Sequence, residues 1–159
     1  MSAACDLCAR IERAERGENP FAVVRTATGY VNLADVQYHE GYTIFVAKQC
    51  VHELHELPAA ERDLHLHEMA VVAEAVFEAF RPRKLNYELL GNGAPHVHWH
   101  LFPRHAGDPR PRGPVWEDPR FLRALREGAS PEPARLAARR AQLRSALDDT
   151  DLTIERRFE

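Results

Sequence analysis

Residues 86–104 read Asn-Tyr-Glu-Leu-Leu-Gly-Asn-Gly-Ala-Pro-His-Val-His-Trp-His-Leu-Phe-Pro-Arg, and the run from His96 to His100 forms their centre. Histidines alternate there with apolar residues, and a period of two is typical of a strand with one buried face. Because residues i, i+2 and i+4 of a strand share a face, we expect the three imidazoles to point the same way. A glycine- and proline-containing loop, residues 91–95, precedes the strand. The stretch therefore predicts a row of proton-carrying nitrogens at the end of a loop, which is a suitable place for chemistry.

Two other interpretations of the three histidines stay open. A His-x-His pair on a strand is also a metal-ligand geometry, so the three side chains could form a catalytic metal site. They could also lie on a solvated strand face, although histidine is too uncommon to make this spacing an expected accident.

Length, charge and cysteine content limit the class of protein. A chain of 159 residues is long enough for one ordinary domain with a proper core. The net charge of −3 gives no electrostatic reason to expect a nucleic-acid partner. No apolar run approaches a membrane span, and the N-terminus lacks the order of a signal peptide. Three cysteines, an odd number, fit a reducing compartment. We expect a soluble cytoplasmic protein with no membrane partner.

Short apolar runs separated by tight turns predict an antiparallel sheet. The expected strands are residues 21–27, 30–36, 42–48 and 85–90, followed by the histidine strand. Residues 58–80 change to a helical period and predict a long amphipathic helix on the sheet. We place His65 and His67, near its start, on the exposed surface.

The two ends of the chain carry weaker signals. Residues 11–17 are polar and predict a short helical turn, and residues 108–114 are rich in proline and arginine and predict an irregular surface strap. Apolar residues at helical spacing predict two C-terminal helices, residues 121–126 and 133–147. The last dozen residues are polar, and we expect them to fray.

A Cys-x-x-Cys pair, Cys5 and Cys8, stands near the start of the chain. Such a pair can be half a zinc site, a redox dithiol or a pair without a role. A redox dithiol is normally set in a strand-to-helix turn, and no strand is expected before this pair. Metal binding is therefore the favoured functional interpretation, provided that further ligands lie elsewhere in the chain.

The order of elements and the motif together resemble the histidine triad (HIT) family of nucleotide hydrolases and transferases. Its motif is His-φ-His-φ-His-φ-φ, with φ apolar, and residues 96–102 match every position. The resemblance covers about residues 5–104 and implies an α+β fold with a five-stranded antiparallel sheet and a long helix, usually paired as a homodimer. We expect residues 1–104 to form this core with an N-terminal zinc-binding arm. Residues 105–159 would add the strap and a C-terminal helical extension packed on the same domain.

The resemblance also implies roles for single residues. His98 would attack the α-phosphorus of an adenine or other purine nucleotide, and water would hydrolyse the nucleotidyl-histidine that forms. The substrate would be an ester, an anhydride such as a dinucleoside polyphosphate, or a phosphoramidate. His100 would contact the phosphate, and His96 would complete the catalytic triad. Asn92 would help hold the phosphate, and Asp35 would bind the ribose hydroxyls.

Two departures from the family pattern keep a nucleotide-binding protein without turnover as an alternative. Members often carry Gly-Gln-Ser/Thr before the triad, where this chain has only Asn92-Gly93-Ala94-Pro95. A further histidine, expected after a glycine near the third strand, is replaced by Tyr42. Separately, Trp116 follows the stiff strap, so we expect it over or next to a nucleotide site, with core packing as the alternative.

Some members of the family carry a structural zinc ion. Its ligands are a Cys-x-x-Cys pair, the histidine of a Lys-x-His stretch after the third strand, and the first triad histidine. The resemblance therefore implies Cys5, Cys8 and His96 as zinc ligands here. The Lys-x-His stretch of this chain ends in Cys50, and cysteine is itself a zinc ligand. Cys50 would complete the site, with His52 as the alternative, and zinc is the only cofactor expected.

Overall fold

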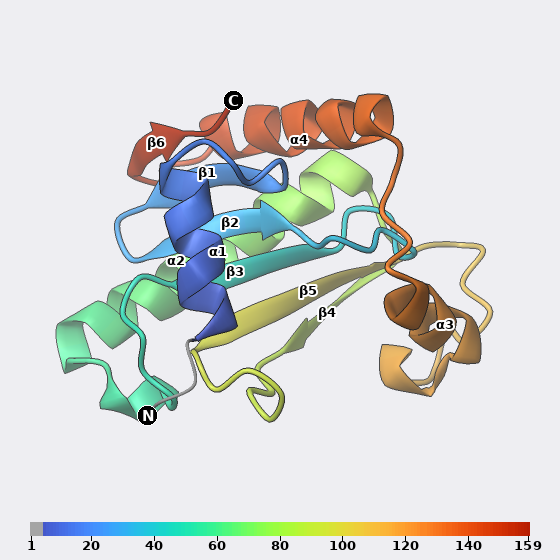
Figure 1. The fold of residues 1–159 in the computed structure, drawn as a ribbon, viewed down its shortest axis with the longest axis horizontal. Coiled ribbons are helices and arrows are strands. Elements are labelled where there is room, and N and C mark those ends of the chain that lie inside the picture. Colours follow the sequence, from blue (N-terminus) through green and yellow to red (C-terminus); the bar gives the residue numbers. More distant parts are fainter. Residues whose placement is uncertain (1–4) are drawn as a thin grey trace.

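The computed structural model describes residues 5–159, so the first four residues of the expected core lie outside it. Its sheet is antiparallel, with the strand order β4-β5-β3-β2-β1-β6 (Figure 1). The strands are β1 (Ala22–Thr26), β2 (Gly29–Leu33), β3 (Thr43–Ala47), β4 (Lys84–Glu88), β5 (His98–Arg104) and β6 (Ile154–Arg157). The helices are α1 (Asp6–Glu15), α2 (Ala59–Phe80), α3 (Pro119–Glu127) and α4 (Pro133–Asp148), with short 3-10 turns at η1 (Leu54–Glu56) and η2 (Val115–Glu117). The expected α+β class is confirmed, and the sheet has one strand more than the five expected.

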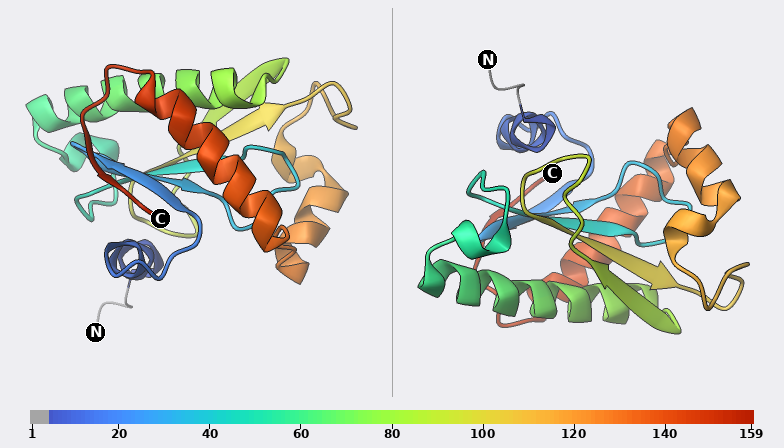
Figure 2. Two further views of the ribbon diagram at one scale, coloured as in Figure 1. Left: turned by 90° about the horizontal axis from the view of Figure 1, so that it is seen from above. Right: turned by 90° about the horizontal axis from the view of Figure 1, so that it is seen from below.

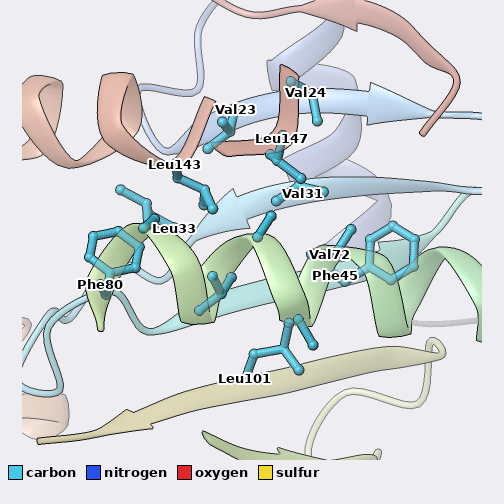
Figure 3. Packing of buried hydrophobic residues seen from close by; sticks show 14 of the residues in the cluster. Val23, Val24, Val31, Leu33, Phe45, Val72, Phe80, Leu101, Leu143 and Leu147 are labelled. Carbon is cyan, nitrogen blue, oxygen red and sulfur yellow. The ribbon is translucent and has the colours of Figure 1, made fainter. Parts of the chain in front are cut away.

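Helices α2 and α4 lie on one face of the sheet, and α1 lies on the other (Figure 2). The main core fills the space between the sheet and helices α2 and α4 (Figure 3). Its fully buried side chains come from every layer and include Val31, Phe45, Leu101, Val72 and Leu143. Each side chain of this size contributes about 1.5–3 kcal/mol when it leaves water. The core therefore fixes β5, which carries His98 and His100, and its neighbour β3.

The strand register decides which way the triad points. His98 lies opposite Val46 of β3, and His100 lies opposite Ile44. Residues directly opposite each other share a face, and successive residues of a strand alternate between faces. Phe45, between the two β3 residues, is part of the core under α2. His98 and His100 therefore face away from α2, on the side of the sheet that α1 occupies.

The turn into β3 depends on Gly41. Its φ of 82° lies in the left-handed region that glycine adopts without strain. An added Cβ would also run into the ring of Phe80 at the end of α2. The turn delivers Tyr42 to the start of β3, where its ring stacks on Phe102 with centroids 4.0 Å apart. The tyrosine that replaces the expected histidine thus has a fixed position on the triad face.

The expectation that His65 lies on the surface is wrong. Its side chain is 0% exposed, and its ring stacks on Phe45 with centroids 4.7 Å apart. Its Nδ1 lies 3.0 Å from Oγ1 of Thr28. His67, two positions on, is exposed as expected. The helix turns about 100° per residue, so two histidines two residues apart lie on opposite sides of it.

Glu68, one turn after His65, is also buried, at 2% exposed. Its carboxylate accepts hydrogen bonds from Oγ1 of Thr26 (2.7 Å), the Ala27 amide (3.0 Å) and the Thr28 amide (2.9 Å). The Thr28 hydroxyl donates to it as well. The charged side chain is therefore fully used in tying the β1–β2 turn to α2.

Both ends of the chain differ from expectation. Helix α1 begins at Asp6, whereas a turn over residues 11–17 was expected. The fraying expected at the C-terminus is wrong, because β6 pairs with β1 and Val24 lies opposite Arg157. Phe158 is 3% exposed and packs with Tyr30 on the α1 side. The β1 edge, the buried Phe158 and the partly buried Leu152 and Ile154 order a segment whose other residues are polar. Within the described residues, no helix is both long and apolar enough to cross a membrane.

Candidate active site

Hydrogen bonds join the triad histidines into one chain. Nδ1 of His98 lies 2.6 Å from the carbonyl oxygen of His96. Nε2 of His98 lies 3.0 Å from Nε2 of His100. At the other end, the Tyr42 hydroxyl lies 2.6 Å from Nδ1 of His100. His98 is buried, at 6% exposed, and His100 is half-buried.

The chemistry of the partners fixes the direction of each hydrogen bond. A carbonyl can only accept, so Nδ1 of His98 carries the proton and its Nε2 holds a lone pair. Nε2 of His100 must then donate to that lone pair, and its Nδ1 must accept from Tyr42. Burial, and secondarily the charge of Glu88, raises the pKa of Tyr42 well above its usual value, so the hydroxyl stays a donor. These hydrogen bonds thus place a lone pair of His98 beside an N–H of His100.

Burial also decides the charge of the site. Burial, followed by the neighbouring His98, lowers the pKa of His100 to about 4. Burial likewise lowers the pKa of His96. His100 is therefore neutral near pH 7 and offers a hydrogen-bond donor rather than a positive charge. A neutral donor can stabilise charge that develops on a phosphate oxygen during reaction.

A compact cluster of metal-ligating groups adjoins the triad. It consists of Cys5, Cys8, Cys50 and His96, whose ligand atoms all lie within 4.8 Å of one another. Nδ1 of His96 is 3.5 Å from Sγ of Cys5 and 3.6 Å from Sγ of Cys8. Tetrahedral zinc would separate such ligand atoms by roughly 3.5–3.8 Å. The spacing of the four groups fits a zinc ion.

The protonation of the cluster points to a cation as well. Nε2 of His96 donates to the carbonyl oxygen of Ala47 at 2.8 Å, which leaves the Nδ1 lone pair facing the sulfurs. Burial and the neighbouring thiols raise the pKa of Cys8 to about 12. Without a cation the Cys8 thiol therefore keeps its proton, and a bound cation would displace that proton. His52, the alternative ligand, is exposed and lies outside the cluster that residues 5–159 form.

Asp35 lies on the β2 flank of this face. Its carboxylate forms a two-pronged ion pair with Arg10 of α1, with N–O distances of 2.5 and 2.6 Å. The side chains are 31% and 43% exposed, so the pair is open to solvent. Arg10 could not be singled out from the sequence, because its position two residues after Cys8 belongs to no motif. The ion pair ties α1 to the sheet beyond the metal cluster.

Trp116 and Glu88 lie on the opposite flank, at β4. Glu88 is directly opposite His100 in the β4–β5 register. Nε1 of Trp116 donates to Oε2 of Glu88 at 2.5 Å. The indole ring meets His100 edge-on, with centroids 5.7 Å apart. Glu88 was not singled out from the sequence, although its even spacing from neighbouring β4 residues could have placed it on this face.

Arg104 organises the strap that leads to Trp116. Its side chain is buried and forms an ion pair with Asp108, four residues on. It also donates to Oδ1 of Asn86 (2.6 Å) and to the carbonyl oxygens of Gly113 (3.0 Å) and Arg110 (2.6 Å). One guanidinium thus fastens a segment without regular secondary structure to strand β4. This arrangement holds Trp116 over the end of the triad strand.

A model of the HIT domain matches residues 16–107, more than half of the chain. The chain belongs to the histidine triad family. It resembles a histidine triad protein from Marinobacter aquaeolei VT8, with 25% identity and a TM-score of 0.66, over 86% of this chain and 93% of that one. A zinc-bound histidine triad family protein from Mycobacterium smegmatis has 18% identity and a TM-score of 0.62, over 91% of this chain and 94% of that one. A hypothetical histidine triad nucleotide-binding protein from Sulfolobus tokodaii strain 7 has 16% identity and a TM-score of 0.67, over 89% of this chain and 93% of that one.

Comparison with curated protein sequences gives no match. The structural coverage extends past the matched HIT domain, so part of residues 105–159 shares the fold of the solved HIT proteins as well. The expectation that the likeness ends near residue 104 was too narrow. Residues 86 and 104, which fasten the strap, lie within the matched HIT domain itself.

The folded chain does not bring together every site residue that was predicted from its sequence. Asn92 is exposed in the loop before the triad. Within residues 5–159, no hydrogen bond joins the side chain of Asn92 or Asp35 to the three histidines. Trp116, by contrast, lies against His100. Of the predicted binding residues, Trp116 thus contacts the triad, whereas Asn92 and Asp35 form no hydrogen bond with it among the described residues.

Proposed function

We propose that the chain is a HIT-type nucleotide hydrolase or nucleotidyl transferase. It cleaves at the α-phosphate of an adenine or other purine nucleotide ester, anhydride or phosphoramidate, through a covalent intermediate on His98. The observation that carries this proposal is the hydrogen-bond chain that leaves a lone pair on Nε2 of His98 beside the N–H of His100. A neutral imidazole with an unprotonated nitrogen is a good nucleophile near pH 7.

The proposed reaction has two displacements. Nε2 of His98 attacks the α-phosphorus and forms an N–P bond, while the P–O or P–N bond to the leaving group breaks with its electron pair. An amine or alcohol leaving group takes up a proton from solvent as it departs. The bond from Nδ1 of His98 to the His96 carbonyl then stabilises the positive charge of the phosphorylated ring. His100 donates its N–H to a phosphate oxygen in the transition state. Water attacks the phosphorus in the second step and releases the nucleotide and His98.

We place the nucleoside between α1 and the triad. Ile44, which is only partly buried, separates His100 from β2 on this face and offers apolar surface for a purine. Asp35 would accept the ribose hydroxyls, which requires sharing its carboxylate with Arg10. Asn92 would hold the phosphate when its loop closes on the substrate.

Two other functions make different predictions. A hydrolase with a metal ion on all three histidines is disfavoured, because His96 already donates to Ala47 and turns its Nδ1 to the sulfurs. A nucleotide-binding protein without turnover has one observation in its favour. Among residues 91–95, no side chain other than Asn92 can donate a hydrogen bond to the phosphate.

The test is a turnover assay with a fluorogenic adenosine phosphoramidate and a panel that includes a dinucleoside polyphosphate. We expect hydrolysis without added metal, and an acid-labile mass increase on His98 when the reaction is stopped early. Activity that depends on reloading a metal after chelation would favour the metal-dependent hydrolase. Nucleotide binding without any turnover would favour the binding protein.

We further propose that Cys5, Cys8, Cys50 and His96 hold a structural zinc ion. Bound zinc would tie the start of α1 to the triad strand, and its binding energy would add to folding stability. We expect about one zinc per chain by elemental analysis. Cys50→Ser should lower zinc retention, Cys50→His should preserve it, and His52→Ala should leave it unchanged. Protein that carries no stoichiometric metal and has three freely reactive thiols would contradict the zinc site.

We also propose a homodimer that pairs through the β4 edge. The two sheet edges differ, because β4 and the loop after it expose Tyr87 (48%) and Leu90 (50%), whereas β6 exposes charged residues. Charged side chains protect an edge from further pairing. Light scattering should give the mass of two chains, and Tyr87→Lys should shift it toward one. None of the three cysteines forms a disulfide, which supports a cytoplasmic location. The division into residues 1–104 and 105–159 stays a prediction.

A further inference from the structure

Glu88 places a negative charge at the edge of the triad. It ends β4 directly opposite His100, so the two side chains share a face and their Cβ atoms lie about 5 Å apart. Trp116 donates its indole N–H to one carboxylate oxygen. Within residues 5–159, the side chain forms no ion pair and makes only this hydrogen bond. The charge of Glu88 is therefore oriented but not neutralised.

The other charges near the triad already have partners. Arg10 neutralises Asp35, and Asp108 neutralises Arg104. His100 itself is neutral near pH 7. Glu88 thus stands as an unneutralised carboxylate beside a site that is meant to receive a phosphate. A carboxylate in this position repels further negative charge and attracts a cation.

Strand order separates the two flanks of the triad strand. Asp35 follows β2, which lies beyond β3, and Glu88 ends β4 on the other side of β5. If the ribose is held at Asp35 and the phosphorus sits at His98, the nucleoside fills the first flank. The group that leaves the phosphorus then extends toward the second flank, where Glu88 and Trp116 lie.

A cleft of about 460 Å³ continues from Glu88 along β4 and under the strap. Its other charged lining residues are Lys84, Arg104 and Arg112. Arg104 is neutralised, and Arg112 and Lys84 are exposed. Lys84 stands four residues before Glu88, roughly 13 Å away along an extended strand. The carboxylate is therefore the charged group of the cleft that lies closest to His100.

We propose that Glu88, held by Trp116, selects a leaving group that carries a positive charge close to the scissile bond. The favoured substrates are nucleoside phosphoramidates or esters whose leaving group bears an ammonium or guanidinium group. Polyphosphate leaving groups would bring several negative charges toward an unneutralised carboxylate and would be disfavoured. This inference rests on the proposed function, which leaves the class of leaving group open.

The test uses three adenosine 5′-phosphoramidates whose N-substituents have the same length and end in an ammonium, a hydroxyl or a carboxylate. The ratio of kcat/KM for the ammonium and carboxylate compounds is measured for the wild type and for Glu88→Gln. Glutamine keeps an acceptor for the Trp116 N–H and removes only the charge. Dividing one ratio by the other cancels the intrinsic reactivity of the three compounds.

We expect the wild-type preference for the ammonium compound to exceed that of Glu88→Gln about tenfold, the scale of one partly desolvated ion pair. Glu88→Lys should reverse the preference, and high salt should weaken it in the wild type. Glu117→Gln is the matched control, because Glu117 is an exposed carboxylate next to Trp116 that pairs with Arg110. It should keep the wild-type preference.

Equal preference in the wild type and in Glu88→Gln would overturn the inference and leave the proposed function intact. Equilibrium affinities of the same compounds for His98→Ala, which should not consume them, give a second readout. A protein that turns over none of the compounds would refute the proposed function. The affinities would still decide the role of Glu88, which predicts tighter binding of the ammonium compound than of the carboxylate compound.

Discussion

Two histidines on opposite faces of the sheet, His65 and His100, have similarly lowered pKa values but different surroundings. Burial lowers the pKa of both His65 and His100 to about 4. His65 is 0% exposed and lies between α2 and the sheet, where its Nδ1 meets Thr28 and its Nε2 has no partner among the described residues. His100 is half-buried and forms part of a chain of directed hydrogen bonds.

The difference teaches that a perturbed pKa is a weak indicator of function by itself. The spare nitrogen of His65 is enclosed, so no ligand can reach it. The donor of His100 and the lone pair of His98 lie at a face with open charged groups on both flanks, Asp35 and Glu88. Access separates the two sites, because His100 is half-buried at a face of the sheet whereas His65 is fully enclosed.

The largest expected effect is the loss of turnover in His98→Ala. Removing the nucleophile leaves no group that can form the covalent intermediate, so kcat should fall by about 10⁴-fold or more. The melting temperature should change little, and kcat of His67→Ala, an exposed histidine on α2, should match the wild type. Substantial residual turnover in His98→Ala would end the proposed mechanism.

On the other face, Glu68→Gln should cost stability rather than activity. The carboxylate accepts four hydrogen bonds in the β1–β2 turn, and an amide cannot accept them all. We expect the free energy of unfolding to fall by about 4 kcal/mol, as measured by urea denaturation. Glu74→Gln, an exposed site on the same helix, is the control. Lost turnover in protein that is still fully folded would contradict the division between the two faces.

The third prediction concerns stability in acid. Burial holds the pKa of His65 at about 4, against about 6.5 in the unfolded chain, although Glu68 acts in the opposite direction. As pH falls from 6.5, the unfolded state binds the proton first, so the stability present above pH 6.5 is lost progressively down to about pH 4. The loss due to His65 is at most about 3 kcal/mol.

His65→Phe, which keeps an aromatic ring on Phe45, should therefore lose less stability than the wild type over that pH range. His67→Gln should keep the wild-type acid profile, because this side chain is exposed. Chemical denaturation at a series of pH values gives both profiles. Parallel profiles for wild type and His65→Phe would show that another group carries the acid sensitivity.

The smallest effect is expected at Tyr42. Tyr42→Phe keeps the stacking on Phe102 but removes the hydroxyl that donates to Nδ1 of His100. His100 can then adopt either tautomer, so kcat should fall about tenfold while KM changes little. Nitrogen-15 NMR of His100 should show one neutral tautomer in the wild type and a mixture in the variant. A single tautomer in both proteins would remove Tyr42 from the mechanism.

The sequence predicted the triad strand and its neighbours because local patterns decide them. Alternating residues fix a strand face, and helical spacing fixes the apolar side of α2. The same spacing puts His65 on the apolar side of α2, four residues before Met69 and seven before Val72, and the prediction overlooked it. What spacing could not show is its partner Thr28, far away in the sequence. The same holds for the link between Glu88 and Trp116, which two segments on either side of the triad form together. Arg10, likewise, acquires its partner only when α1 packs on the sheet.

Cysteine spacing and the family resemblance predicted which metal-ligating groups lie close together. In the structure Cys50, and not His52, joins Cys5, Cys8 and His96. The reason for that outcome was not visible in the pattern alone. Cys50 follows β3 closely, whereas His52 lies in an exposed bend before η1. Strand β6 was missed because its residues are mostly charged. Pairing with the β1 edge, the burial of Phe158 and the packing of Leu152 and Ile154 against the main core order it.

The pairing of β6 with β1 has a consequence for the order of folding. Val24 and Arg157 meet across the longest sequence separation in the sheet, so the loop that joins them is the most costly to close. β1 therefore spends the early part of folding as an open edge, whereas β2 and β3 can pair through short connections. During that interval a second chain can add to β1 and start aggregation. Refolding yield should accordingly fall as protein concentration rises, even though β6 covers the β1 edge in the folded sheet.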